Sequence, residues 1–113
     1  MEDLRLERRG GLALAAFAGE LVSEKVPGLR REMDRLLADP GCRTLVLDLA
    51  DVSFLDSSGI GFLVSLAARA KAEDKHLRLL DLSPQARKTL ELVQLIAYFE
   101  VLQGREALAG LQD

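Results

Sequence analysis

The residues best suited to chemistry form one short run, Asp56-Ser57-Ser58-Gly59. It offers a carboxylate and two hydroxyls, which can serve as a nucleophile or accept a phosphoryl group. A serine nucleophile needs a base beside it. The only histidine is His76, and nothing in the sequence places it near Ser57. A serine hydrolase that uses Ser57 is therefore disfavoured, and we predict that the chain is not an enzyme.

The sequence also contains no motif that indicates a bound metal ion or cofactor. His76 and Cys42, the single cysteine, do not have the spacing of metal ligands. Gly59 and Gly61 form only G-x-G and lack the third glycine of a dinucleotide fingerprint. We predict no metal ion and no cofactor. His76 is interpreted as a residue of a solvated turn, and Cys42 as a small apolar filler.

Length, composition and charge narrow the class of protein. The chain has 113 residues, of which 49% are hydrophobic and 29% charged, with a net charge of −3. These values predict one domain over residues 1–113 and disfavour a nucleic-acid surface. No apolar run approaches the roughly 18–20 residues that span a bilayer. The first residues lack the apolar stretch of a signal peptide. We predict a cytoplasmic protein with no membrane insertion.

Hydrophobic periodicity predicts alternating strands and helices. The expected order is β-β-α-β-α-β-α-β-α, an α/β fold with a mixed, mainly parallel sheet. The predicted strands are a first strand around Leu4 and Leu6, Leu12 to about Ala18, Thr44 to Leu49 extended by Val52 and Phe54, His76 to Leu82, and Phe99 to Leu102. The predicted helices are Ser23 to Ala38, 57 to about 73, Ser83 to roughly Gln94, and a short one after Gly104 through Leu108 and Leu111.

This order places the polar run at the carboxyl end of a strand and at the start of an amphipathic helix. Open α/β sheets usually carry their sites at such a position. Asp56 or Ser57 can cap the helix, and free N–H groups beside Ser57 would tolerate a phosphate. Gly59 and Gly61 leave the turn without side chains, so another backbone could come close.

The helix that begins here also carries an apolar pair, Phe62 and Leu66, four residues apart. Both lie off the predicted core stripe of Ile60, Leu63, Val64, Ala67 and Ala70. Two interpretations stay open. The pair forms a docking surface beside the serine, or it is buried under another element of the chain.

The segment TLVLDLADVSFLDSSGIGFLVSL resembles the central part of the STAS domain of bacterial anti-sigma factor antagonists. The resemblance covers nearly the whole chain and includes Gly19-Glu20-Leu21 and Leu82-Ser83-Pro84. It implies a protein that binds an anti-sigma factor, itself a serine kinase, and so releases a sigma factor. It also implies that the kinase modifies the serine after the aspartate and that a serine phosphatase restores it.

Carried onto this sequence, the resemblance makes Ser57 the phosphorylated residue. The residues predicted to contact the partner are Glu20, Asp56, Ser58, Gly59, Gly61, Phe62 and Leu66. Two alternatives remain: Ser57 is only a helix cap, or Ser58 is the acceptor. Val22 departs from the family, because many phosphorylatable antagonists have aspartate after Gly-Glu-Leu. A different role, as the STAS subunit of a stress-sensing assembly or of an inner-membrane lipid-transport complex, also fits a chain of this length.

Overall fold

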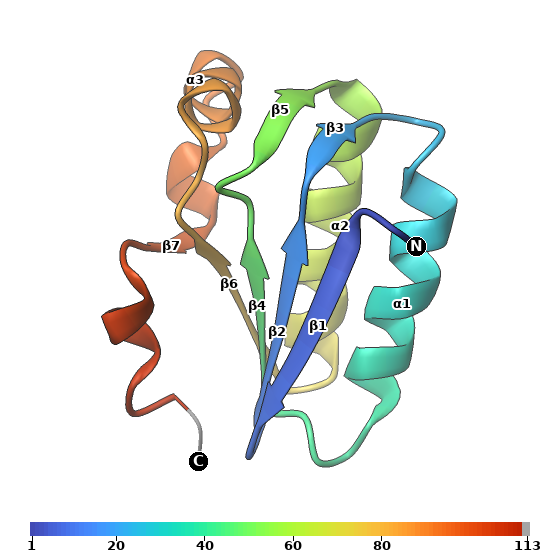
Figure 1. The fold of residues 1–113 in the computed structure, drawn as a ribbon, viewed down its shortest axis with the longest axis vertical. Helices are drawn as coiled ribbons and strands as arrows, with labels where there is room; N and C mark the ends of the chain where they lie inside the picture. Colours follow the sequence, from blue (N-terminus) through green and yellow to red (C-terminus); the bar gives the residue numbers. More distant parts are fainter. Residues whose placement is uncertain (112–113) are drawn as a thin grey trace.

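A five-stranded sheet forms the centre of the computed structural model, which describes residues 1–111 (Figure 1). Its spatial order is β1-β2-β4-β6-β7. The strands are β1 (Leu4–Arg9), β2 (Leu12–Phe17), β4 (Thr44–Asp48), β6 (His76–Leu80) and β7 (Glu100–Leu102). β1 and β2 form an antiparallel hairpin, and every other neighbouring pair is parallel. The prediction of a mixed, mainly parallel α/β fold is confirmed.

The two faces of this sheet are covered differently. The helices are α1 (Val26–Ala38), α2 (Ser57–Ala72) and α3 (Pro84–Leu92). Figure 1 shows α1 and α2 on one side of the sheet and the C-terminal segment on the other. The larger core lies under the helices, and a smaller cluster on the opposite face surrounds Leu108. Within residues 1–111, no helix is both long and apolar enough to cross a membrane.

A second, two-stranded sheet was not predicted. β3 (Gly19–Leu21) pairs in parallel with β5 (Val52–Leu55), so the expected single strand from Thr44 to Phe54 is wrong. The chain turns between β4 and β5. There the Ala50 N–H donates to the Asp48 carboxylate at 3.1 Å, and the Val52 N–H donates to the Leu49 carbonyl at 3.2 Å. These local bonds end β4 and redirect the chain along β3.

Several predicted boundaries also differ. α1 begins at Val26 rather than Ser23, which places Pro27 in its first turn, where a missing N–H costs nothing. α3 ends at Leu92, and a 3-10 turn at Ile96–Tyr98 precedes β7. The predicted last helix is a 3-10 turn, Arg105–Leu108, that does not reach Leu111. A single turn suffices here because it places the side chain of Leu108 in the smaller cluster.

Polar contacts fix α2 against α1. The Arg30 guanidinium donates to the Ser65 hydroxyl at 3.0 Å and lies 5.3 Å from the centre of the Phe62 ring. Beyond the C-terminal end of α2, the Lys75 ammonium donates to the carbonyls of Leu37 and Asp39, the latter at 2.9 Å. The bond to Leu37 satisfies a carbonyl in the last turn of α1, whereas the Asp39 carbonyl also accepts from the Cys42 N–H at 3.0 Å. Because α2 is held along its length, the position of its first turn is fixed too.

The anchoring role of Leu108 can be measured. The substitution Leu108→Ala removes a side chain with no exposed surface and should lower the free energy of unfolding by about 2–4 kcal/mol. The control Leu92→Ala changes a side chain that is 73% exposed and should alter stability by less than about 0.5 kcal/mol. Urea denaturation followed by circular dichroism gives both values. Equal losses in the two variants would show that the C-terminal segment does not contribute to the core.

Candidate functional site

Asp56 caps α2. Its backbone is extended, with φ −97° and ψ −176°, and its carboxylate accepts a hydrogen bond from the Gly59 N–H at 2.9 Å. Its carbonyl accepts the first helical bond, from the Ile60 N–H at 2.9 Å. Of the two capping residues left open by the sequence, the structure therefore selects Asp56. Ser57 is the first residue of the helix, and its exposed hydroxyl does not serve as the cap.

Gly59 is required by packing inside the chain. A Cβ at this position would lie 2.4 Å from the Leu21 carbonyl oxygen and 2.7 Å from Leu55 Cδ1. Both distances are far below van der Waals contact, so only glycine fits. The backbone that comes close here is the chain's own β3. The prediction that Gly59 leaves room for a partner is therefore wrong.

Gly61 differs from Gly59 although only one residue separates them. It is exposed, and a Cβ built on it would meet nothing within 4 Å. No contact within the described part of the chain explains a glycine at this position. Contact between Gly61 and a partner stays a prediction, and Gly61 is the bare surface beside Ser57 that such a contact would use.

Phe62 and Leu66 are buried, each with 1% of its surface exposed. The interpretation of the pair as a surface patch is wrong, and the alternative interpretation is confirmed. The buried stripe of α2 is displaced around the helix axis from the predicted one, because α2 packs against both the sheet and α1. Ile60, Val64 and Ala67, which were expected at the core, lie half-buried at the margins of that stripe.

One aromatic residue beside the site was missed. Phe54 is 50% exposed and lies on β5, three residues before Ser57. Strand alternation places Phe54 on the same face as buried Val52, so the sequence suggested burial. The register of β3 against β5 shifts between Gly19 and Glu20, and this irregularity breaks the alternation. A hydrophobicity pattern carries no signal for such a shift.

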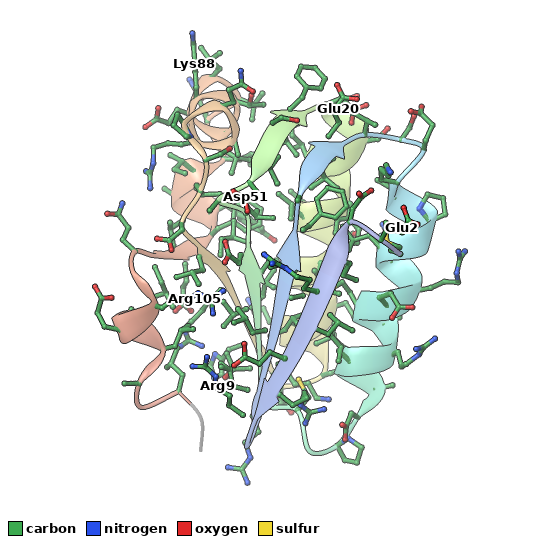
Figure 2. All side chains as sticks on the ribbon, viewed as in Figure 1. Glu2, Arg9, Glu20, Asp51, Lys88 and Arg105 are labelled. Atoms are coloured by element: carbon green, nitrogen blue, oxygen red, sulfur yellow. The ribbon has the colours of Figure 1, made fainter. Side chains whose placement is uncertain are left out.

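The two chain segments that border Ser57 are acidic. Glu20 is exposed and pairs in register with Phe54, and Figure 2 places it at the end of the molecule where α2 starts. The segments 19–24 and 51–61, which border the site, contain no lysine or arginine. Their charged residues are Glu20, Glu24, Asp51 and Asp56. Ser58 is half-buried, so Ser57 is the more accessible of the two adjacent serines. Val22 is also half-buried.

Neither His76 nor Cys42 belongs to this site. His76 follows the far end of α2, whose 16 residues span about 24 Å. No proton transfer between His76 and Ser57 is feasible over that length. Cys42 is buried, and burial raises the pKa of its thiol. An inert thiol agrees with its interpretation as a small filler.

Comparison with known proteins gives consistent results. The sequence model of the STAS domain family matches residues 3–108. An anti-sigma-B factor antagonist of Staphylococcus aureus is 31% identical over 88 residues, covering 78% of this chain and 81% of the relative.

Two solved structures have the same fold. An anti-sigma factor antagonist from Mycobacterium paratuberculosis superposes with a TM-score of 0.82 at 24% identity, covering 97% of this chain and 93% of the other. The Bacillus cell fate determinant SpoIIAA in its phosphorylated form superposes with a TM-score of 0.75 at 23% identity, covering 96% and 98%.

The two glycines of the site should respond oppositely to the same substitution. Gly59→Ala places a methyl group against the Leu21 carbonyl and should lower the free energy of unfolding by about 2–3 kcal/mol. Gly61→Ala adds a methyl group in open space and should raise it by about 0.5–1 kcal/mol through helix propensity. Chemical denaturation of both variants tests this. A Gly59→Ala variant as stable as the parent would mean that β3 does not approach α2 this closely.

Proposed function

Because the chain belongs to the STAS domain family, we propose that it is an anti-sigma factor antagonist acting in the cytoplasm. It binds an anti-sigma factor and so releases a sigma factor. The anti-sigma factor is also a serine kinase that phosphorylates Ser57, and the phosphate ends the interaction. A serine phosphatase restores the binding form. The protein acts by binding and has no catalytic residues of its own.

The observation that carries this proposal is the exposed hydroxyl of Ser57 at the first position of α2. A kinase can reach this hydroxyl without unfolding the helix. Asp56, not Ser57, supplies the cap, so esterifying Ser57 leaves the helix start intact. A phosphate at this position also gains from the positive end of the helix dipole. Ser57 can therefore change its charge while the fold around it stays unchanged.

The charge around Ser57 explains why a phosphate would act on a partner. The segments 19–24 and 51–61 contain no basic residue, so neither of these two segments offers the phosphate an ion-pair partner. The group adds almost two negative charges and stays on the surface. A partner that packs closely over Gly61 and Phe54 would have to bury these charges unpaired. The free energy needed to desolvate these charges is larger than the free energy gained from the close contact, so the complex dissociates.

The surface also indicates the chemistry of the anti-sigma factor. Phe54 offers an aromatic side chain that is half exposed, and partly buried aromatics are common anchors in protein interfaces. Glu20 and Asp56 surround it with negative charge. A complementary partner surface has an apolar pocket for Phe54 and basic residues around that pocket. The solved phosphorylated form of the Bacillus relative SpoIIAA supports the choice of a phosphoryl group as the switch.

The site of modification can be tested directly. Incubation of the protein with its cognate anti-sigma factor and ATP should add one phosphate, which peptide mass spectrometry should place on Ser57. Ser57→Ala should abolish the modification because the accepting hydroxyl is gone. Ser58→Ala should retain it because that neighbour is not the acceptor. Phosphorylation of Ser57→Ala at the parent rate, or its loss in Ser58→Ala alone, would refute the assignment.

The effect of charge on binding needs a separate measurement. Ser57→Asp should weaken binding to the anti-sigma factor at least about tenfold in isothermal titration calorimetry, because it buries an unpaired charge at the contact. Ala68→Asp is the matched control. It adds the same charge at an exposed position of α2, about 16 Å further along the helix axis, and should leave affinity within about twofold. Equal affinities of all three proteins would rule out charge at Ser57 as the switch.

A further inference from the structure

β1 is an unpaired edge of the five-stranded sheet. It pairs with β2 on one side, and no described strand pairs with its other side. Its central residues Arg5, Leu6 and Glu7 are exposed, and Leu6 keeps 47% of its surface open. An edge strand presents a row of backbone donors and acceptors that another strand can complete. The sequence of β1 determines which strand that would be.

The pattern of hydrogen bonds between β1 and β2 shows which backbone groups of β1 point toward the open edge. The Ala18 N–H donates to the Asp3 carbonyl at 2.9 Å, and the register with β2 continues without a shift to Arg9. In an antiparallel pair, hydrogen-bonded residues alternate with non-bonded ones. Residues 3, 5, 7 and 9 therefore direct their backbone groups toward β2. Leu4, Leu6 and Arg8 direct theirs toward the open edge.

We propose that β1 pairs antiparallel with β1 of a second copy of this chain, around a two-fold axis at Leu6. In this register the outward-facing residues meet: Leu6 lies opposite Leu6 of the other copy, and Leu4 opposite Arg8. Each of these pairs exchanges two backbone hydrogen bonds. The interface is the same patch on both copies, as closed two-fold dimers require.

The charges of β1 match this register. Arg5 lies opposite Glu7 of the other copy, twice by symmetry, and Asp3 lies opposite Arg9. Unlike charges directly across strands stabilise the pairing. Arg5 and Glu7 point to the same face of the sheet, away from α1, because they pair with Ala16 and Leu14 on that face. Among the described residues Arg5 has no ion-pair partner, so its charge is available for the contact.

Other registers place like charges opposite each other. Sliding one strand by two residues in one direction puts Arg5 opposite Arg5 and Asp3 opposite Glu7. Sliding it in the other direction puts Glu7 opposite Glu7 and Arg5 opposite Arg9. A slide by one residue places outward-facing backbone groups opposite residues whose backbone groups face β2, so the two strands cannot form hydrogen bonds. Charged residues on edge strands usually prevent pairing, but this arrangement prevents the neighbouring registers and favours one.

The dimer leaves Ser57 accessible in both copies. β1 runs along the side of the sheet, whereas Glu20 and the start of α2 lie at one end of the molecule (Figures 1 and 2), and Ser57 is the first residue of α2. Antiparallel pairing turns the second copy end over end, so the two Ser57 surfaces lie at opposite ends of a continuous ten-stranded sheet. Each copy can bind its own partner. Dimerisation and the action of Ser57 are therefore independent, and each can be tested without the other.

The test is the oligomeric state of charge variants. Sedimentation velocity over a concentration series should show a reversible dimer of the parent chain. Arg5→Glu and Glu7→Arg should each weaken dimerisation by about tenfold or more, because each reversal turns two attractive cross-strand pairs into repulsive ones. The double variant R5E/E7R should dimerise like the parent, because its cross-strand pairs are again of opposite sign.

Mixing and a distant charge reversal serve as controls. An equimolar mixture of the two single variants should form a mixed dimer, since one copy then carries two negative side chains at positions 5 and 7 and the other carries two positive ones. Arg31→Glu reverses a charge that is exposed on α1, away from β1, and should behave as the parent.

A backbone variant tests the edge itself. Leu6→Pro removes an N–H that points away from β2, so the hairpin keeps its ladder while the dimer loses hydrogen bonds. This variant should be monomeric, with an unchanged circular dichroism spectrum. A parent that stays monomeric at the highest concentration overturns the proposal. So does a dimer that R5E, E7R and Leu6→Pro leave intact, because it would use another surface or another strand.

Discussion

The contact between the first turn of α2 and the carboxyl end of β3 is the constraint on which the site depends. The space between Gly59 and the Leu21 carbonyl admits no Cβ. At the same contact, the Asp56 N–H donates to the Leu21 carbonyl at 3.4 Å. Asp56 is thereby held at the position from which its carboxylate caps the helix. With the cap inside the turn and Gly59 facing the core, Ser57 is left facing solvent.

This arrangement gives each residue of the Asp-Ser-Ser-Gly run a separate physical task. Asp56 satisfies an N–H of the helix start, and Gly59 allows the helix to approach β3. Ser57 contributes to neither, so its hydroxyl can change without cost to the fold. A surface switch requires this separation. If the modified residue also capped the helix, its modification would break the capping bond and weaken the start of the helix.

Much of this could be predicted from sequence, and the failures have identifiable causes. The order of the elements of the five-stranded sheet, the three helices and the position of Ser57 at a helix start after a strand followed from periodicity and from turn residues. β3 and β5 were missed as a separate sheet because each has only three or four residues and a register shift hides their alternation. Phe62 was misplaced because the contacts of α2 with α1 and the sheet decide which side of the helix is buried, and the apolar residues of α2 alone do not fix that side. The exposure of Phe54 was missed because the same register shift between β3 and β5 breaks the alternation of buried and exposed residues. Local patterns describe one element at a time, whereas these residues are placed by contacts between elements.

The same reasoning explains why the proposed dimerisation and the proposed switch can occupy different parts of one small domain. Parallel strands bring the starts of the following helices to one end of the sheet, so Ser57 lies at that end. The open backbone of β1 lies along the side of the sheet, where no described strand pairs with it. Charges on that strand then decide between aggregation and one defined pairing. Asp3, Arg5, Glu7 and Arg9 alternate in sign, and reversing the strand direction about Leu6 puts opposite signs together. Because the sequence of β1 alone determines how β1 would pair, this pairing does not depend on the end of the molecule that carries Ser57.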